Sequence, residues 1–336
     1  MTALPKHEHP IVLAPMAGGA GTPELVAAVG GAGGFGYLPG GYLSADALAE
    51  KLARTRTLTR APFGVNLFVP EPVSPVDLTA YAAALRPEAE RLGVQLGAPD
   101  WADTDHWAEK VELLVTDPVP VVSFTFGLPS AAEVERLHAA GSALVGTATT
   151  VAEAVAVVER GLDAVCVQGP EAGGHRGTHR LLDEPSELPL LELLGAVRGA
   201  VAVPLLAAGG IATAAQVRDV LAAGAYAAQL GTLFLRCPES GASPTHKKAL
   251  TRRRDTVVTR AFSGRPARGQ RNRFIDTHDA AAPAAYPQVH QLTSPLRRAA
   301  AAAGDPEWMH LWAGTGYRRA PDLPAADIIA ALVAEL

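Results

Sequence analysis

The sequence is poor in the residues that build several common reactive centres. It has only two cysteines, Cys166 and Cys237, and neither stands in a Cys-x-x-Cys or other metal-ligand spacing, so both are expected to be packing residues. Its five lysines all lie away from the ends of apolar runs, which argues against a Schiff-base enzyme. No two carboxylates follow neighbouring apolar runs, which argues against a magnesium-dependent enzyme or a glycosidase. We therefore expect a site without a metal.

Long apolar runs are absent as well. Nowhere do about 18 apolar residues follow one another, as a membrane-spanning helix requires, and the first residues contain no apolar stretch of signal-peptide length. The formal net charge is −5 and charged residues make up only 19% of the chain, so no overall field favours nucleic acid or an anionic membrane. We expect a soluble, cytoplasmic protein whose partner is a small molecule.

One cluster of positive charge runs from Arg252 to Arg273. Aromatic residues make up only 5% of the chain, and no series of stacking aromatics is interleaved with these arginines. The pattern therefore indicates a solvated face or an anchor within a substrate-binding part, rather than a nucleic-acid site.

What the chain does contain is a regular alternation of strand-like and helix-like segments. Stretches with helical spacing cover residues 23–32, 44–56, 131–140, 151–160 and 214–223. They lie between eight short apolar runs, which begin near Ile11, Gly34, Phe63, Val119, Ala143, Ala164, Leu205 and Ala227. Strict alternation predicts parallel strands, and runs that are apolar on both faces predict strands buried on both sides. The expected fold is an α/β fold of the (β/α)8 TIM-barrel type, with an open doubly wound sheet as the competing interpretation.

The alternation also predicts the domain boundaries. It stops after Thr232, so we expect residues 1–234 to form the barrel and residues 235–317 to form a smaller, mainly helical substrate or lid domain. An amphipathic stretch within residues 318–336 is expected to complete the barrel as a C-terminal helix. The longest gap between runs, from Phe63 to Val119, carries a proline-rich segment and is expected to hold extra helices.

Glycines follow the last two apolar runs, where a barrel commonly holds a phosphate. Gly209 and Gly210 follow one run and Gly231 the next, and a helix is expected to begin near Thr213. Glycine lets backbone N–H groups approach an anion closely, and a helix N-terminus adds positive potential. The alternative is that these glycines only make tight turns. The segment 31–36 fits Gly-x-Gly-x-x-Gly, but it follows a helix and precedes a strand, which is the reverse of a dinucleotide-binding fingerprint.

His175 stands in a glycine-rich loop with Gly173, Gly174 and Gly177. Such a backbone can wrap a flat ligand and leave one imidazole in the site, so an acid–base or substrate-orienting role is expected. A metal site is the alternative, because Glu171, His175 and His179 are spaced four apart, although the glycines between them disfavour the helix that such a site needs.

Two amide side chains also end apolar runs. Asn66 and Gln168 could each donate to and accept from the polar edge of a heterocycle. Structural roles in turns are the alternative for both.

Taken together, these segments resemble the nitronate monooxygenases, formerly called 2-nitropropane dioxygenases, from Pro10 to about Tyr317. The resemblance is carried by Ala14-Pro-Met-Ala-Gly-Gly19, Pro62-Phe-Gly-Val-Asn-Leu67, Ser123-Phe-Thr-Phe-Gly127, Glu171-Ala-Gly-Gly-His-Arg-Gly177, Ala208-Gly-Gly-Ile211, Gly231-Thr232, Phe262-Ser-Gly-Arg-Pro-Ala-Arg268 and Leu311-Trp-Ala-Gly314.

The resemblance implies an FMN-dependent oxidoreductase that uses O2 to convert alkyl nitronates into carbonyl compounds and nitrite. FMN would lie across the barrel mouth, and a homodimer would be compatible with the resemblance. The cofactor-binding residues would then be Met16, Asn66, Gln168, Gly173, Gly174, Gly209, Gly210, Gln229, Leu230, Gly231 and Thr232, and His175 would face the substrate.

The chain departs from the family pattern at two positions. Thr125 stands where many relatives have a histidine, and Thr315 follows Trp-Ala-Gly where many have a glutamine. These changes leave other functions of the same fold open, namely an FMN-dependent NAD(P)H enoyl-acyl-carrier-protein reductase, an NADH:quinone reductase, or a flavin-binding scaffold without catalysis. The physiological nitronate and the oligomeric state are not set by the sequence.

Overall fold

The computed structural model describes residues 2–72 and 74–336, so residue 73 of the proline-rich segment lies outside the described residues. Eight parallel strands form a closed barrel in the order β1-β2-β3-β4-β5-β6-β8-β9, which confirms the predicted (β/α)8 fold. The strands are β1 (Ile11–Leu13), β2 (Phe35–Pro39), β3 (Phe63–Phe68), β4 (Val121–Thr125), β5 (Ala143–Ala148), β6 (Ala164–Gln168), β8 (Leu205–Ala208) and β9 (Ala227–Leu230). The barrel closes where Ile11 of β1 pairs with Ala228 of β9.

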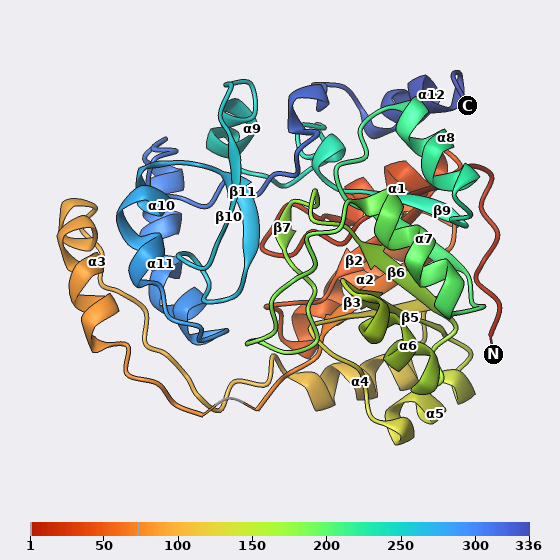
Figure 1. Cartoon of the computed structure of the whole chain (residues 1–336), viewed down its shortest axis with the longest axis horizontal. Helices are drawn as coiled ribbons and strands as arrows, with labels where there is room; N and C mark the ends of the chain where they lie inside the picture. Colours follow the sequence, from red (N-terminus) through yellow and green to blue (C-terminus); the bar gives the residue numbers. More distant parts are fainter. Residues whose placement is uncertain (1, 73) are drawn as a thin grey trace.

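Helices cover the outside of the barrel (Figure 1). Most begin at a hydroxyl cap: Thr22 and Ser44 each accept a backbone N–H of the following helix, and Ser130 forms a capping box with Glu133. The covering helices are α1 (Pro23–Gly31), α2 (Ala45–Leu58), α4 (Trp107–Thr116), α5 (Ala131–Ala139), α6 (Val151–Glu159), α7 (Leu190–Ala200), α8 (Ala214–Ala222) and α12 (Ala325–Val333). Segment 31–36 leads from α1 into β2 and therefore ends a helix, as expected.

Two layers of apolar side chains stabilise the barrel. The larger packs the strands against the surrounding helices, including Ile328 and Leu332 of α12. The smaller fills the barrel interior and draws Val12, Tyr37, Val145 and Cys166 from different strands. Cys237 is buried in the larger layer, so both cysteines pack in the core. No helix in the described ranges is long and apolar enough to cross a membrane.

A third apolar cluster lies beside the barrel and joins two distant parts of the sequence. It packs α3 (Thr79–Arg91) from the long gap between β3 and β4 against α10 (Arg273–His278) and α11 (Gln288–Ala302). Figure 1 shows α3, α10 and α11 together on the side away from the chain termini. This part also contains α9 (Pro244–Ala249) and the short 3-10 helices η2 (Asp279–Ala281) and η3 (Tyr317–Arg319), while η1 (Thr232–Phe234) follows β9 directly.

The region after β9 also contains a hairpin that the sequence pattern did not reveal. Strands β10 (Thr256–Thr259) and β11 (Ala267–Gln270) pair antiparallel, and β11 pairs in turn with β7 (Gly174–His175). Four-residue strands between arginines give little period-2 signal, and their partners are distant in sequence. The hairpin links the added region to the glycine-rich loop after β6.

Candidate active site at the barrel mouth

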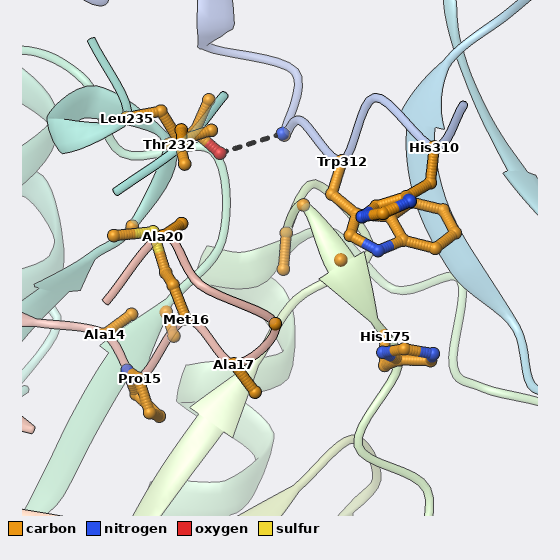
Figure 2. A pocket seen from close by; sticks show the side chains of 18 of the residues that line it. Ala14, Pro15, Met16, Ala17, Ala20, His175, Thr232, Leu235, His310 and Trp312 are labelled. Carbon is orange, nitrogen blue, oxygen red and sulfur yellow. Dashed lines mark hydrogen bonds between the residues drawn. The ribbon is translucent and has the colours of Figure 1, made fainter. Parts of the chain in front are cut away.

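A cavity of about 520 Å³ lies at the carboxyl ends of the barrel strands and extends to the added region. It brings together all the residues that were predicted to bind the cofactor, together with His175, and Figure 2 shows several of them around it. They are Met16, Asn66, Gln168, Gly173, Gly174, His175, Gly209, Gly210, Gln229, Leu230, Gly231 and Thr232. Their common location agrees with one shared site, while their roles toward a cofactor stay predictions.

The glycine loops after β8 and β9 form one wall of this cavity. Gly209 and Gly210 have φ values of +135° and +67°, which favour glycine. A Cβ at Gly210 would lie 2.7 Å from the Cβ of Glu171 and 2.8 Å from Oγ1 of Thr315. Within the described ranges, the N–H groups of Gly209, Gly210 and Gly231 donate to no backbone acceptor. Unpaired donors near the N-terminus of α8 fit the phosphate of the expected FMN.

Thr232 connects this wall to the chain that returns from the added region. Its Oγ1 accepts a hydrogen bond from the N–H of Gly314 at 3.0 Å (Figure 2). A Cβ at Gly173 would lie only 2.3 Å from the same nitrogen, so the three backbone segments meet too closely for any larger residue there. The contact fixes the glycine-rich loop of His175 against the β9 turn.

The two amides have partners within the protein. Asn66 is buried, and its Nδ2 donates to Oγ of Ser123 at 3.0 Å and to Oγ1 of Thr125 at 3.1 Å. Gln168 spans the next loop: its Nε2 donates to the carbonyl of His175 at 3.0 Å and its Oε1 accepts from the N–H of Gly177 at 2.8 Å. Thr125, one of the two departures from the family pattern, therefore orients Asn66. Gln168 holds the His175 loop in addition to facing the cavity.

His175 is oriented by a serine. Its Nε2 lies 2.9 Å from Oγ of Ser263, and that oxygen lies 3.2 Å from the carbonyl of Arg265, which can only accept. A serine hydroxyl carries one proton, so Ser263 donates to Arg265 and accepts from Nε2–H of His175. This arrangement leaves Nδ1 of His175 unprotonated. Aromatic rings of Phe126, Tyr286 and Trp312 surround the imidazole at centroid distances of 5.6, 5.5 and 5.6 Å.

His175 is also uncharged near neutral pH. Burial lowers its pKa to about 3, and the positive charges of Arg265 and Arg297 act in the same direction. A neutral imidazole with a free Nδ1 can accept a proton or a hydrogen bond from a ligand.

Several cavity residues were missed in the sequence analysis. Tyr42, His290, Arg297, His310 and Trp312 line the cavity beyond the barrel mouth, and no Asp or Glu is among its lining residues. The signal for α11 was present: His290, Ser294 and Arg297 recur at helical spacing on one face. That face could not be assigned to a site without the contact between α11 and the barrel.

The geometry bears on two alternatives from the sequence. One is a metal site in the glycine-rich loop, and the other is whether the clustered arginines form a solvated face or an anchor. Glu171, His175 and His179 do not share a helix, and no group of three or more potential metal-ligating side chains occurs in residues 2–72 and 74–336. Two of the clustered arginines are anchors: Arg268 donates to the carbonyl of Pro170 at 2.8 Å, and Arg265 pairs with Glu71 at 3.2 Å. Both hold the hairpin region to the barrel loops.

A closed parallel barrel with a cavity at its carboxyl mouth is typical of (β/α)8-barrel enzymes. The model of the nitronate monooxygenase family matches residues 1–335. A probable nitronate monooxygenase of Staphylococcus aureus strain Newman is 37% identical over 100% of this chain and 96% of its own length. The chain therefore belongs to the nitronate monooxygenase family and is an oxidoreductase.

Solved structures are similar over nearly the whole chain. Nitroalkane oxidase from Streptomyces ansochromogenes is 51% identical, with a TM-score of 0.94 over 98% of this chain and 96% of its own. FabK from Thermotoga maritima is 29% identical, with a TM-score of 0.74 over 98% of this chain and 93% of its own. Both comparisons extend through the barrel and the added region.

Proposed function

We propose that the protein is an FMN-dependent nitronate monooxygenase, which uses O2 to convert an alkyl nitronate into a carbonyl compound and nitrite. The observation that carries the proposal is the single cavity, in which unpaired glycine N–H groups lie at one end and the neutral His175 lies among aromatic rings. Family membership and the similarity to a nitroalkane oxidase support oxidation of nitro compounds. FMN, when bound, supplies the redox chemistry with substrate and O2.

In this proposal the protein's own residues bind and orient. Gly209, Gly210 and Gly231 would hold the phosphate of FMN through their N–H groups, and the segment around Met16 would contact its ring. Asn66 keeps its Oδ1 available, because the hydroxyls of Ser123 and Thr125 engage only its Nδ2. The hydrophobic rings around His175 exclude water from the reacting end of the cavity.

The state of His175 favours nitronates over neutral nitroalkanes. A nitronate enters already deprotonated, whereas a nitroalkane must first lose a carbon-bound proton to a base. An imidazole whose pKa is lowered to about 3 accepts that proton weakly until an anion is formed beside it. A nitronate places no such demand on His175, because it arrives without that proton.

The likeness to FabK makes an NAD(P)H-dependent reductase the second candidate. Anaerobic mixing of the FMN-loaded protein with each electron donor separates the two. The nitronate of nitroethane should bleach the flavin absorbance near its visible maximum, and NADH or NADPH should not within the same time. Rapid bleaching by NAD(P)H together with no reaction with nitronate would indicate that the protein is the reductase and not the monooxygenase. Bound flavin that reacts with neither would indicate a non-catalytic flavoprotein.

A further inference from the structure

Arg297 of α11 is a buried guanidinium with no carboxylate partner in residues 2–72 and 74–336. Its side chain is only 4% exposed, yet it lines the cavity. Its Nε donates to Oγ1 of Thr293 at 3.0 Å, and its two terminal nitrogens lie 3.1 Å from Nδ1 of His310 and 3.1 Å from Nδ1 of His290. The salt bridges of the described chain do not include it. Burying an unpaired charge is costly, so a ligand that neutralises it would recover free energy.

The hydrogen bonds of Arg297 set the tautomers of both histidines. A guanidinium can only donate, so Nδ1 of His290 and Nδ1 of His310 must each accept. Burial and the charge of Arg297 hold the pKa of both imidazoles well below the usual value, so both are neutral. The single ring proton of each therefore lies on Nε2. The side-chain hydrogen bonds of both rings in the described part of the chain are made at Nδ1, so Nε2–H of each has no protein acceptor there, and both residues line the cavity.

The rings that carry these donors are held in place. His290 stacks on Tyr42, with ring centroids 4.1 Å apart and planes 5° apart. The hydroxyl of Tyr42 lies 2.9 Å from the hydroxyl of Tyr286, and the backbone N–H of Tyr42 donates to Oδ1 of Asp105 at 2.8 Å. His310 lies beside Trp312 at a centroid distance of 5.4 Å, above His175 in Figure 2. Donors fixed before a ligand arrives lose little entropy when it binds.

We propose that Arg297, His290 and His310 form an oxyanion receptor in the substrate part of the cavity, separate from the glycine loops, so that the enzyme selects substrates with an anionic oxygen group. The group is a nitronate or a carboxylate on the same substrate. The two histidines donate through Nε2–H, and the guanidinium behind them supplies the opposite charge. The absence of Asp and Glu from the cavity lining leaves that charge unopposed until the anion binds. The proposal rests on the proposed function for the identity of the substrate, but the receptor can be tested without turnover.

The test of the receptor uses acetate, an oxyanion that does not react. Acetate is titrated into FMN-loaded protein, and binding is followed by calorimetry and by the flavin absorbance spectrum. Arg297→Gln should weaken acetate binding by about 10- to 100-fold, because a hydrogen-bonded charge is lost. The matched control is Arg253→Gln, which removes an exposed charge that lies outside the cavity and should change the affinity by less than about 2-fold.

A second variant keeps the test valid if Arg297→Gln does not fold. His290→Phe retains a ring to stack on Tyr42 but removes the Nε2–H donor, and it should also weaken acetate binding, by about 10-fold. Acetate affinity that is unchanged in both variants, or reduced equally by Arg253→Gln, would overturn the receptor. So would a parent protein that binds no acetate.

Two substrates then identify which oxyanion is bound. The KM for the nitronates of nitroethane and of 4-nitrobutanoate is measured in the parent and in Arg297→Gln. A nitronate at the receptor raises both KM values, and a carboxylate at the receptor raises only the second. Unchanged KM for both substrates contradicts the proposal. If the protein oxidises neither nitronate, the proposed function fails, while the acetate titration still decides the receptor.

Discussion

At the scale of single residues, His175 has a fixed tautomer and a fixed charge. Ser263 accepts a hydrogen bond from Nε2–H, and burial keeps the ring neutral with a pKa of about 3. Both features come from the contact between the β6 loop and the β10–β11 hairpin, which places Ser263 against a loop 88 residues earlier. The residue can therefore accept a hydrogen bond at Nδ1 from about pH 5 to pH 9 without a change in its protonation, and it can accept a proton from a ligand only by becoming charged.

The first prediction separates these two uses of His175. If His175 is the base, His175→Asn should lower nitroalkane turnover by roughly 10²- to 10⁴-fold and nitronate turnover much less, because only the nitroalkane must lose a carbon-bound proton. Asparagine retains a polar side chain and avoids a large void. The measurement is nitrite release from nitroethane and from its nitronate at matched pH, with FMN content determined first. Equal losses on both substrates would assign His175 to binding, and no loss on either would remove it from the mechanism.

At the scale of the elements, the loops after β8 and β9 combine left-handed backbone with close packing. Gly210 has φ +67° and is crowded by Glu171 and Thr315, so the loop accepts no side chain there. Thr315, the second departure from the family pattern, also donates its backbone N–H to the carbonyl of Glu171 at 3.0 Å. The glycine loop, the β6 loop and the returning chain thus form one packed unit around the expected phosphate.

The second prediction is that Gly210→Asp empties the cofactor site. The new Cβ would lie 2.7 Å from Glu171, and the carboxylate would bring negative charge to where backbone N–H groups are expected to meet phosphate. Gly93→Asp is the matched control, because Gly93 has φ +65° but no atom within 4 Å of a Cβ and lies outside the cavity. Flavin absorbance per protein should be lost in the first variant and kept in the second. Full FMN content in Gly210→Asp would show that the phosphate lies elsewhere.

Most elements of the barrel were predictable because each is local. The strands β1 to β6, β8 and β9 are short apolar runs, and helices such as α1 and α5 carry their caps and spacing within one segment. The glycine and amide positions followed from them, since barrel sites lie at the carboxyl ends of strands.

The unpredicted parts depend on contacts between distant segments. Strand β7 has two residues and exists only because β11 pairs with it. From the sequence alone, Arg297 would be expected to be an exposed charge on the surface of a helix. Only the packing of α11 beside the barrel mouth makes it a buried cation. Such placements follow from tertiary packing rather than from local periodicity.

At the scale of the whole molecule, the cavity places several neutral histidines between the barrel and the added region. Burial lowers the pKa of His246 to about 4 and that of His175 to about 3, and it holds those of His290 and His310 well below the usual value. In the unfolded chain each of these groups titrates near 6.5. The unfolded state therefore binds more protons than the folded state at moderately acidic pH.

The third prediction is that the protein loses stability in acid. The contribution of these histidines is complete above pH 6.5 and falls as the pH is lowered toward 4, by on the order of 3 kcal/mol for His246 alone. The free energy of unfolding should be measured in urea at pH 7.5 and pH 4.5. His246→Gln, which retains a donor for the carbonyl of Trp312, should reduce the difference between the two values. Equal free energies at both pH values in the parent would contradict the pKa directions.

The proposed function of this barrel is the oxidation of nitronates with FMN and O2. The most direct measurement is nitrite release by aerobic, FMN-loaded protein supplied with a panel of alkyl nitronates, with nitrite, carbonyl product and O2 consumption followed together. Nitrite and carbonyl product are expected in equal amounts, with O2 consumed and no added nicotinamide cofactor required. Fully loaded protein that releases no nitrite from any member of the panel would contradict it.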